Sequence, residues 1–146
     1  MTDPADEIHV LLVEDDPGDI LIIEEALDAL PVSREVHVVG DGREAWDFLC
    51  RIPPYAAAPR PDLILLDLNM PRMDGRELLN LIKADDALST IPTVIFTTSS
   101  AQEDIERSYQ HHANAYVTKP TDLDRLNTAI QRIDEFFTRA ALLPRS

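Results

Sequence analysis

Short, continuous apolar runs recur along the chain, and most of them end at polar or charged residues. Ile8–Val13 (IHVLLV) and Leu63–Leu66 (LILL) are the clearest examples. A strand that is buried on both faces is apolar at successive positions, so these runs predict strands of a sheet that is covered on its two sides. Weaker runs predict further strands at Glu35–Val39, Thr93–Phe96 and Ala115–Val117.

Segments with apolar residues at helical spacing separate the expected strands. Leu21, Ile22 and Ala26 have such a spacing, and Pro31 marks the end of their helix. The expected helices are Pro17–Leu30, Arg43–Ile52, Gly75–Ala84, Gln102–His111 and Leu123–Phe137. Five strands that alternate with five helices predict an α/β fold, a doubly wound five-stranded parallel sheet with helices on both faces.

The chain length fits one domain. Its 146 residues are enough for one hydrophobic core but not for two. We expect an acidic N-terminal arm at residues 1–7, one globular domain at residues 8–137 and a C-terminal tail at residues 138–146. The proline-rich stretch 53–61 is expected to be a loop, because the strand and helix pattern continues after it. Too few residues follow the fifth strand for a second, DNA-binding or catalytic domain, so we expect the chain to act through contact with another protein.

The charge balance is strongly acidic. Lys and Arg number 13 against 27 Asp and Glu, which gives a formal net charge of −14. Such a surface repels nucleic-acid backbones and anionic lipid, so the sequence argues against a nucleic-acid or membrane partner. The single cysteine suits a reducing compartment, and the acidic N-terminus does not look like a secretory signal. We therefore expect a cytoplasmic protein.

Chemically capable side chains follow the expected strands. Glu14 and Asp15 come after the first strand, Asp67 after the third, Thr97 after the fourth and Lys119 soon after the fifth. In doubly wound sheets, ligands bind at the carboxyl ends of the strands, so these residues are expected at one site. Carboxylates that are crowded together repel one another unless a cation joins them. A hard divalent ion with oxygen ligands would serve, and Mg²⁺ suits a site that handles phosphate.

The residues around these strand ends form four motifs. They are Leu12–Pro17 (LVEDDP), Leu65–Gly75 (LLDLNMPRMDG), Phe96–Ser99 (FTTS) and Tyr116–Pro120 (YVTKP). Together they resemble the signatures of the CheY-like receiver domains of two-component response regulators. Each motif alone is weak, but all four occur in the family's order and at spacings that fit it. The resemblance covers about residues 8–137, and it implies a phosphoacceptor with no turnover on other substrates.

The resemblance implies a role for each site residue. Asp67 matches the phosphoacceptor. Glu14 and Asp15 match the acidic pair that holds Mg²⁺ with Asp67, and Asn69 matches the position whose backbone carbonyl also binds the metal. Lys119 matches the ammonium that binds the phosphoryl oxygens. The implied reaction is in-line attack by the Asp67 carboxylate on a phosphoryl group carried by a kinase histidine or a small phosphodonor.

The resemblance also implies a conformational switch. Thr97 matches the hydroxyl that moves to bind a phosphoryl oxygen, and Tyr116 matches the aromatic residue that turns into the space that Thr97 leaves. Phosphorylation would thereby change the surface formed by the fourth helix, the fifth strand and the last helix. Pro120 matches a proline whose preceding peptide bond is usually cis in the family.

Three further features resemble the small receivers that partner phytochrome-type sensor histidine kinases. They are the stretch 53–61, the Thr97–Ser100 run and His112–Tyr116. The expected partner is therefore such a kinase or a phosphotransfer protein. The resemblance also implies a homodimer through the fourth helix, the fifth strand and the fifth helix. The apolar segment 136–143 either belongs to that contact or packs on its own domain.

Other interpretations fit parts of the pattern. Asp16, just before Pro17, could cap the first helix instead of binding a metal. A haloacid-dehalogenase-type phosphotransferase also uses a strand-end aspartate with Mg²⁺, but it needs a second aspartate two residues later, where this chain has Asn69. A receiver that docks without phosphorylation usually lacks an acid, the threonine or the lysine, and none is missing. A nucleotide- or flavin-binding module would need a glycine-rich phosphate loop, and the glycines of this chain form no such pattern.

Overall fold

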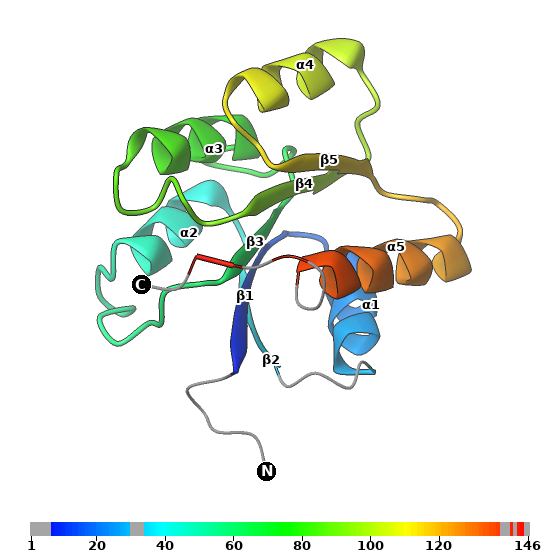
Figure 1. Ribbon diagram of the computed structural model, residues 1–146, viewed down its shortest axis with the longest axis horizontal. Coiled ribbons are helices and arrows are strands. Elements are labelled where there is room, and N and C mark those ends of the chain that lie inside the picture. Colours follow the sequence, from blue (N-terminus) through cyan, green and yellow to red (C-terminus); the bar gives the residue numbers. More distant parts are fainter. Residues whose placement is uncertain (1–6, 30–33, 138–140, 142, 145–146) are drawn as a thin grey trace.

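The computed structural model describes residues 7–29, 34–137, 141 and 143–144. Within these ranges, five strands form one sheet: β1 (Ile8–Val13), β2 (Arg34–Val39), β3 (Leu63–Leu66), β4 (Thr93–Thr97) and β5 (Ala115–Thr118). The same ranges contain the α-helices α1 (Pro17–Asp28), α2 (Gly42–Leu49), α3 (Gly75–Ala84), α4 (Gln102–Gln110) and α5 (Leu123–Glu135). The strand order is β2-β1-β3-β4-β5, and every neighbouring pair is parallel (Figure 1). The predicted fold class is confirmed.

Most residues of the predicted N-terminal arm and C-terminal tail lie outside the described ranges. Residues 1–6 of the predicted arm lie outside them, as do residues 138–140, 142 and 145–146 of the predicted tail. In the part of the chain that is described, no helix is long and apolar enough to cross a membrane.

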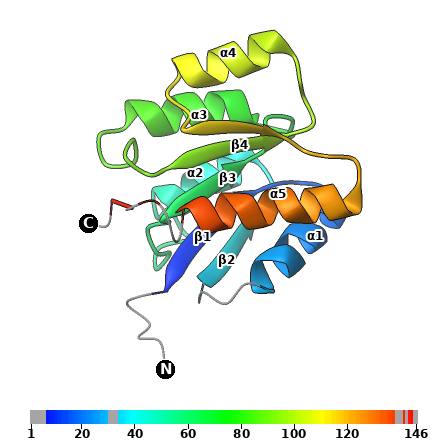
Figure 2. The same cartoon turned by 45° about the vertical axis from the view of Figure 1, so that its right-hand side comes forward.

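The helices cover the two faces of the sheet. Figures 1 and 2 show α1 beside α5 on one face, and α2 beside α3 on the other, with α4 next to β5. Alternate residues of β1 enter the two layers: Leu11 and Val13 pack in the core under α2 and α3. Val10 and Leu12 pack in the core under α1 and α5. Both faces of the strand are buried, which is why its sequence is apolar at nearly every position.

Aspartate caps the amino end of most helices. A backbone N–H of the first turn donates to the cap side chain in α1, α2, α3 and α5, where the caps are Asp16, Asp41, Asp74 and Asp122. The helix-cap interpretation of Asp16 is thereby confirmed. The exception in the described chain is α4, which begins after Ala101 without a side-chain cap and buries only Ser108. Among the described helices, α4 thus has neither a side-chain cap nor a buried apolar residue, and we infer that it is the least firmly held.

Five helix boundaries differ from the predicted ones. Three differ by one or two residues: α2 begins at Gly42, α4 ends at Gln110 and α5 ends at Glu135. The second helix was expected at Arg43–Ile52, whereas α2 ends at Leu49. Arg51 has a φ of 57°, and this left-handed backbone conformation cannot continue a right-handed helix. The first helix ends at Asp28, and Leu30, its predicted last residue, lies outside the described ranges.

The apolar segment after α5 packs in part on its own domain. Phe137 is buried in the core under α1 and α5, and Leu143 packs against the same core. Phe136 is 56% exposed. Of the two interpretations of this segment, the structure therefore favours packing on the domain for Phe137 and Leu143, and it leaves Phe136 free to contact another molecule.

A buried ion pair ties the edge strand to two helices. The Arg34 Nη2 on β2 donates to the Asp134 Oδ2 on α5 at 2.7 Å, and the two side chains are 2% and 4% exposed. The Arg34 Nη1 also donates to the Leu27 carbonyl of α1 at 2.6 Å. Breaking a buried ion pair by removing one partner is strongly destabilising.

We predict that Arg34→Ala lowers the free energy of unfolding by about 3–5 kcal/mol, because the buried ion pair with Asp134 and the hydrogen bond to the Leu27 carbonyl are lost. The ion pair between Arg107 and Glu103 on the surface of α4 supplies the control. Arg107→Ala should lower the same free energy by at most about 0.5 kcal/mol, because water screens that pair. Urea denaturation measures both, and equal losses would contradict the importance of the buried pair.

The amino end of α3 lies against the backbone at the end of β3. A Cβ added to Gly75 would stand 2.2 Å from the Asp67 carbonyl oxygen and 2.7 Å from the Leu68 Cα. The Gly75 N–H donates to the Leu68 carbonyl at 3.0 Å. Only glycine permits this approach, which fixes the position of Asp67 relative to α3.

We predict that Gly75→Ala lowers the free energy of unfolding by about 1–3 kcal/mol, because the added methyl group must displace backbone atoms. Gly40→Ala is the matched control. A Cβ at Gly40 would meet its nearest neighbour, the Glu44 Oε2, at an ordinary 3.7 Å. Urea denaturation compares the two proteins, and a Gly75→Ala protein as stable as the control would show that α3 can move away from Asp67 at no cost.

Candidate functional site

The carboxyl ends of β1, β3, β4 and β5 meet at one edge of the sheet, as the sequence predicts. The Lys119 Nζ donates a hydrogen bond to the Glu14 carboxylate and a second one, at 3.0 Å, to the Asp19 Oδ2. It also lies 3.5 Å from the Asp67 Oδ2. Lys119, Glu14 and Asp67 are all buried. One buried ammonium is thus surrounded by carboxylates from β3, α1 and the end of β1.

Glu14, Asp15 and Asp67 form a set of oxygen donors that suits a divalent cation. Each offers one carboxylate oxygen, and these oxygens lie within 4.8 Å of one another. Glu14 and Asp67 are buried whereas Asp15 is exposed, so the set opens to solvent on the Asp15 side. The Asn69 N–H donates to the Asp67 Oδ1 at 3.3 Å, and Asn69 lines the same surface hollow as Asp15. The predicted ligand residues therefore lie together, and such hard oxygen donors fit an ion like Mg²⁺.

The charges of this edge perturb one another. Burial, with the nearby charge of Asp67, raises the pKa of Glu14 to about 7 against the lowering effect of its hydrogen bond with Lys119. Burial favours the neutral form of Lys119, but its hydrogen bond with Glu14 and the charges of Glu14 and Asp67 outweigh burial and raise its pKa. A carboxyl group with a raised pKa beside further carboxylates is what one expects where a cation completes the charge balance.

Asp19 is a member of the site that the sequence reasoning missed. It lies in the first turn of α1 and accepts a hydrogen bond from Lys119. Its position in the sequence could have identified it, because the helix that contains it starts directly after β1. The first turn of such a helix lies over the strand ends. An acidic residue is also favourable there because the helix N-terminus carries partial positive charge.

Thr97 ends β4 with its hydroxyl fully buried. Its side chain has 0% exposure, and the Oγ1 has no hydrogen-bond partner among the residues that the structure describes. A buried hydroxyl without a partner is unfavourable by about 1–3 kcal/mol. The Thr97 side chain is therefore in a position where a new acceptor nearby would stabilise it.

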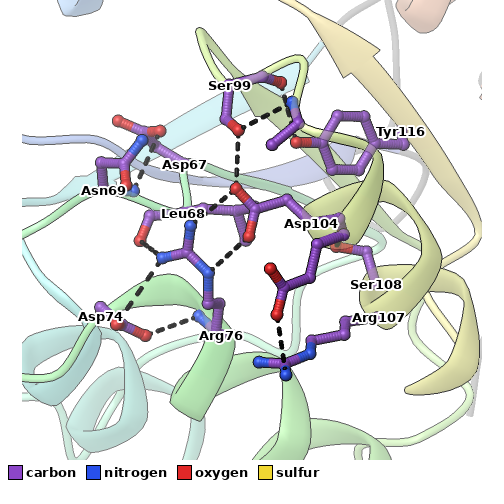
Figure 3. Close-up of polar contacts among 12 residues, drawn as sticks. Asp67, Leu68, Asn69, Asp74, Arg76, Ser99, Asp104, Arg107, Ser108 and Tyr116 are labelled. Carbon is purple, nitrogen blue, oxygen red and sulfur yellow. Dashed lines mark hydrogen bonds and ion pairs between the residues drawn. The ribbon is translucent and has the colours of Figure 1, made fainter.

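A polar network joins the segment after β4 to α4 and β5. The Tyr116 hydroxyl on β5 donates to the Ser99 carbonyl at 2.9 Å, and the Ser99 hydroxyl donates to the Asp104 Oδ2 at 2.6 Å (Figure 3). The Tyr116 backbone N–H donates to the Tyr109 hydroxyl of α4 at 3.1 Å. The predicted switch residue thus holds the two ends of the β4–β5 connection together.

The same network continues to α3 through Arg76. The Arg76 Nε and Nη2 donate to the two carboxylate oxygens of Asp104, each at 2.9 Å (Figure 3). The hydrogen bonds from Arg76 and Ser99 lower the pKa of Asp104. Arg76 also approaches the Leu68 carbonyl at 3.5 Å, next to Asp67. Sequence reasoning missed this connection, because Arg76 and Asp104 lie far apart in the chain and each is an ordinary surface residue type.

The peptide bond between Lys119 and Pro120 is trans, which corrects the expectation of a cis bond there. In the described part of the chain, the cis bond lies between Pro53 and Pro54. The Lys119 N–H donates to the Thr97 carbonyl at 2.7 Å, so the pairing of β5 with β4 continues up to the lysine. Trans is the more stable isomer of a bond before proline by about 0.5–1 kcal/mol, and the lysine reaches its carboxylate partners without the cis form.

Comparison with known proteins agrees with this geometry. A family model described as the response regulator receiver domain matches residues 10–131. The response regulator Rcp1 of Synechocystis sp. is 41% identical over 135 residues, which cover 92% of this chain and 92% of that protein. A match of this length includes every strand end described above.

Two solved structures share the fold over nearly their full length. The phosphorylated cyanobacterial phytochrome response regulator RcpA has a TM-score of 0.93 and 46% identity, over 95% of this chain and 99% of that chain. The Mn²⁺-bound form of Rcp1 has a TM-score of 0.92 and 40% identity, over 94% of this chain and 99% of that chain. The strand-end carboxylates, the buried lysine and these similarities have one explanation: the chain belongs to the response regulator receiver domain family.

Proposed function

We propose that the chain accepts a phosphoryl group on Asp67, in a Mg²⁺-dependent reaction, from a sensor histidine kinase or a phosphotransfer protein. The observation that carries this proposal is the surroundings of Asp67. A buried carboxylate at a strand end lies 3.5 Å from a buried ammonium and next to two further carboxylates. The similarity to phosphorylated RcpA and to Mn²⁺-bound Rcp1 supports both parts of the proposal.

In the proposed reaction, Asp67 is the nucleophile. One of its carboxylate oxygens attacks phosphorus, a P–O bond forms, and the P–N bond to the kinase histidine breaks with its electron pair going to the imidazole. Lys119 faces the Asp67 Oδ2 and neutralises negative charge on the transferred group. The Asn69 N–H holds the Asp67 Oδ1 and so orients the carboxylate. Mg²⁺, held by Glu14, Asp15, Asp67 and the Asn69 carbonyl, supplies further charge neutralisation when bound.

The same residues argue against turnover on small phosphate esters. A phosphotransferase of the haloacid-dehalogenase type uses a second carboxyl group two residues after its nucleophile, and that position is Asn69. An amide neither donates nor removes a proton as a carboxyl group does. The missing second carboxyl group supports the proposal that the chain acts as a receiver, without turnover on other substrates.

The output of the switch follows from the unpaired Thr97 hydroxyl. A phosphoryl oxygen on Asp67 gives that hydroxyl an acceptor, so Thr97 moves toward it. The movement empties space beside β4 into which Tyr116 turns, and Tyr116 then loses its hydrogen bond with the Ser99 carbonyl. Because Ser99 also bonds Asp104 of α4, the change reaches the least firmly held helix.

The partner is assigned from the relatives and the surface. RcpA is a phytochrome response regulator, so a phytochrome-type sensor kinase is the proposed phosphodonor. The net charge of −14 disfavours nucleic acid and anionic membranes, which leaves protein contact as the output. A homodimer through α4, β5 and α5 is part of the proposal, since Tyr109 on α4 and Leu123 on α5 are exposed.

Intact mass spectrometry after incubation with acetyl phosphate tests the acceptor. We expect one phosphoryl adduct with Mg²⁺, none without it, and none on Asp67→Asn. Asp16→Asn is the matched control and should keep the adduct, because Asn caps a helix about as well as Asp does. An adduct that survives Asp67→Asn would assign another acceptor.

Light scattering on the same samples tests the homodimer. A monomer both before and after phosphorylation would contradict the proposed homodimer.

Hydrogen exchange of α4 tests the proposed output path. Arg76→Gln removes the paired bonds to Asp104, so we expect α4 to exchange faster and the change on phosphorylation to shrink, while the adduct still forms. Arg107→Gln is the control, because Arg107 pairs with Glu103 on the exposed side of the same helix. If both variants respond equally, the Arg76–Asp104 contact plays no special part in transmission.

A further inference from the structure

A second cluster of potential metal ligands lies on β1 and β2, away from the site described above. His9 is paired with Glu35 across the two strands, and His37 follows two residues later on the same face of β2. The His9 Nδ1 lies 3.2 Å from the His37 Nε2 and 3.6 Å from the Glu35 Oε2. The His37 Nε2 lies 3.8 Å from the Glu35 Oε1. Two imidazole nitrogens and a carboxylate thus converge on one point.

The spacing of these donor atoms fits a tetrahedral metal ion. Zinc binds histidine nitrogen and carboxylate oxygen at about 2.0–2.2 Å, so neighbouring ligand atoms of a tetrahedral site stand roughly 3.3–3.5 Å apart. The two imidazole nitrogens stand 3.2 Å apart, and Glu35 places one carboxylate oxygen 3.6 Å from the His9 Nδ1 and the other 3.8 Å from the His37 Nε2. One ligand atom from each of the three residues lies within 4.8 Å of the other two, so a rotation of the exposed Glu35 carboxylate would complete the geometry.

Neighbouring residues hold the His37 ring and the His9 backbone in place. The His37 ring packs on Phe48 with the ring centres 5.3 Å apart, and Phe48 packs on Tyr55 at the same separation. The His9 backbone is fixed on both sides by Asp62: its N–H donates to the Asp62 Oδ2 at 2.9 Å, and its carbonyl accepts from the Asp62 N–H at 2.7 Å. Preorganised ligands need little further ordering when they bind an ion.

The chemistry of the cluster also suits a metal. Burial, followed by the charge of His9, lowers the pKa of His37 against the raising effect of Glu35 and Glu7. The imidazole is thus kept in its neutral, metal-binding form. A hydrogen bond between the two imidazoles would satisfy only one of the three close contacts. Side chains of His9 and His37 are 22% and 18% exposed and Glu35 is 53% exposed, so an ion has access from solvent.

We propose that His9, Glu35 and His37 bind a Zn²⁺ ion whose fourth position is taken by water. Two nitrogens and one oxygen suit zinc better than Mg²⁺, which prefers oxygen ligands throughout. The ion would tie the edge strand β2 to β1 at the end of the sheet opposite Asp67. His9 precedes Glu14 by five positions of an extended strand, so the two sites are separated by about 16 Å.

The test is calorimetric titration of the whole chain with Zn²⁺ in saturating Mg²⁺, which occupies the carboxylate site. We expect one zinc site in the wild type and a rise in the melting temperature on binding. His37→Gln and Glu35→Gln should each weaken binding about tenfold or more, since even indirect supports of a metal site contribute that much. Glu35 is half exposed, so Glu35→Gln remains informative if His37→Gln fails to fold.

The chain provides its own matched control. Its four histidines divide into the pair His9 and His37 and the exposed pair His111 and His112 at the end of α4. The double variant His111→Gln/His112→Gln should bind Zn²⁺ as the wild type does. The proposal is overturned if the wild type shows no zinc site in Mg²⁺. It is equally overturned if that double variant loses the site, or if Glu35→Gln and His37→Gln both keep it at full affinity.

Discussion

The buried ammonium of Lys119 is the interaction on which the functional edge of this protein depends. It bonds Glu14 and Asp19 and faces Asp67, so a single side chain connects α1, β3 and the end of β1 to the segment after β5. Opposite charge favours the charged form of a buried lysine, and the carboxylates would repel one another without it. The same balance leaves surplus negative charge at the edge, which a divalent cation would offset. The packing of this edge and its proposed chemistry therefore depend on the same ammonium and carboxylate groups.

From this edge, polar contacts lead to the one helix that lacks a side-chain cap among those described. Ser99 bonds Asp104, and Asp104 bonds Arg76, which lies in the first turn of α3 (Figure 3). A weakly anchored helix held by a few specific bonds is suited to two positions, because breaking those bonds is enough to release it. The parallel strands, by contrast, are packed between two apolar cores.

Most of the fold could be predicted from the sequence because burial on both faces leaves a clear apolar signal. The bounds of β1, β3 and α3 agree with the predicted ones. The predicted end of α2 was wrong, because the backbone of Arg51 takes a left-handed conformation. The residue types at this point give no sign of that conformation. The predicted cis isomer of the Lys119–Pro120 peptide bond was also wrong. The family pattern suggested cis, whereas the bond is trans and the Lys119 N–H is still hydrogen-bonded.

The class of sheet, and the edge at which the acids, the threonine and the lysine gather, could be predicted from the amino-acid pattern alone, because parallel strands place their carboxyl ends together. Which of these side chains touch depends on how the elements pack. The tertiary structure added Asp19 to the lysine, joined Arg76 to Asp104 and brought His9 to His37. Such contacts depend on distances of a few ångströms between separate elements, and those distances follow from packing and strand register, which local periodicity does not encode.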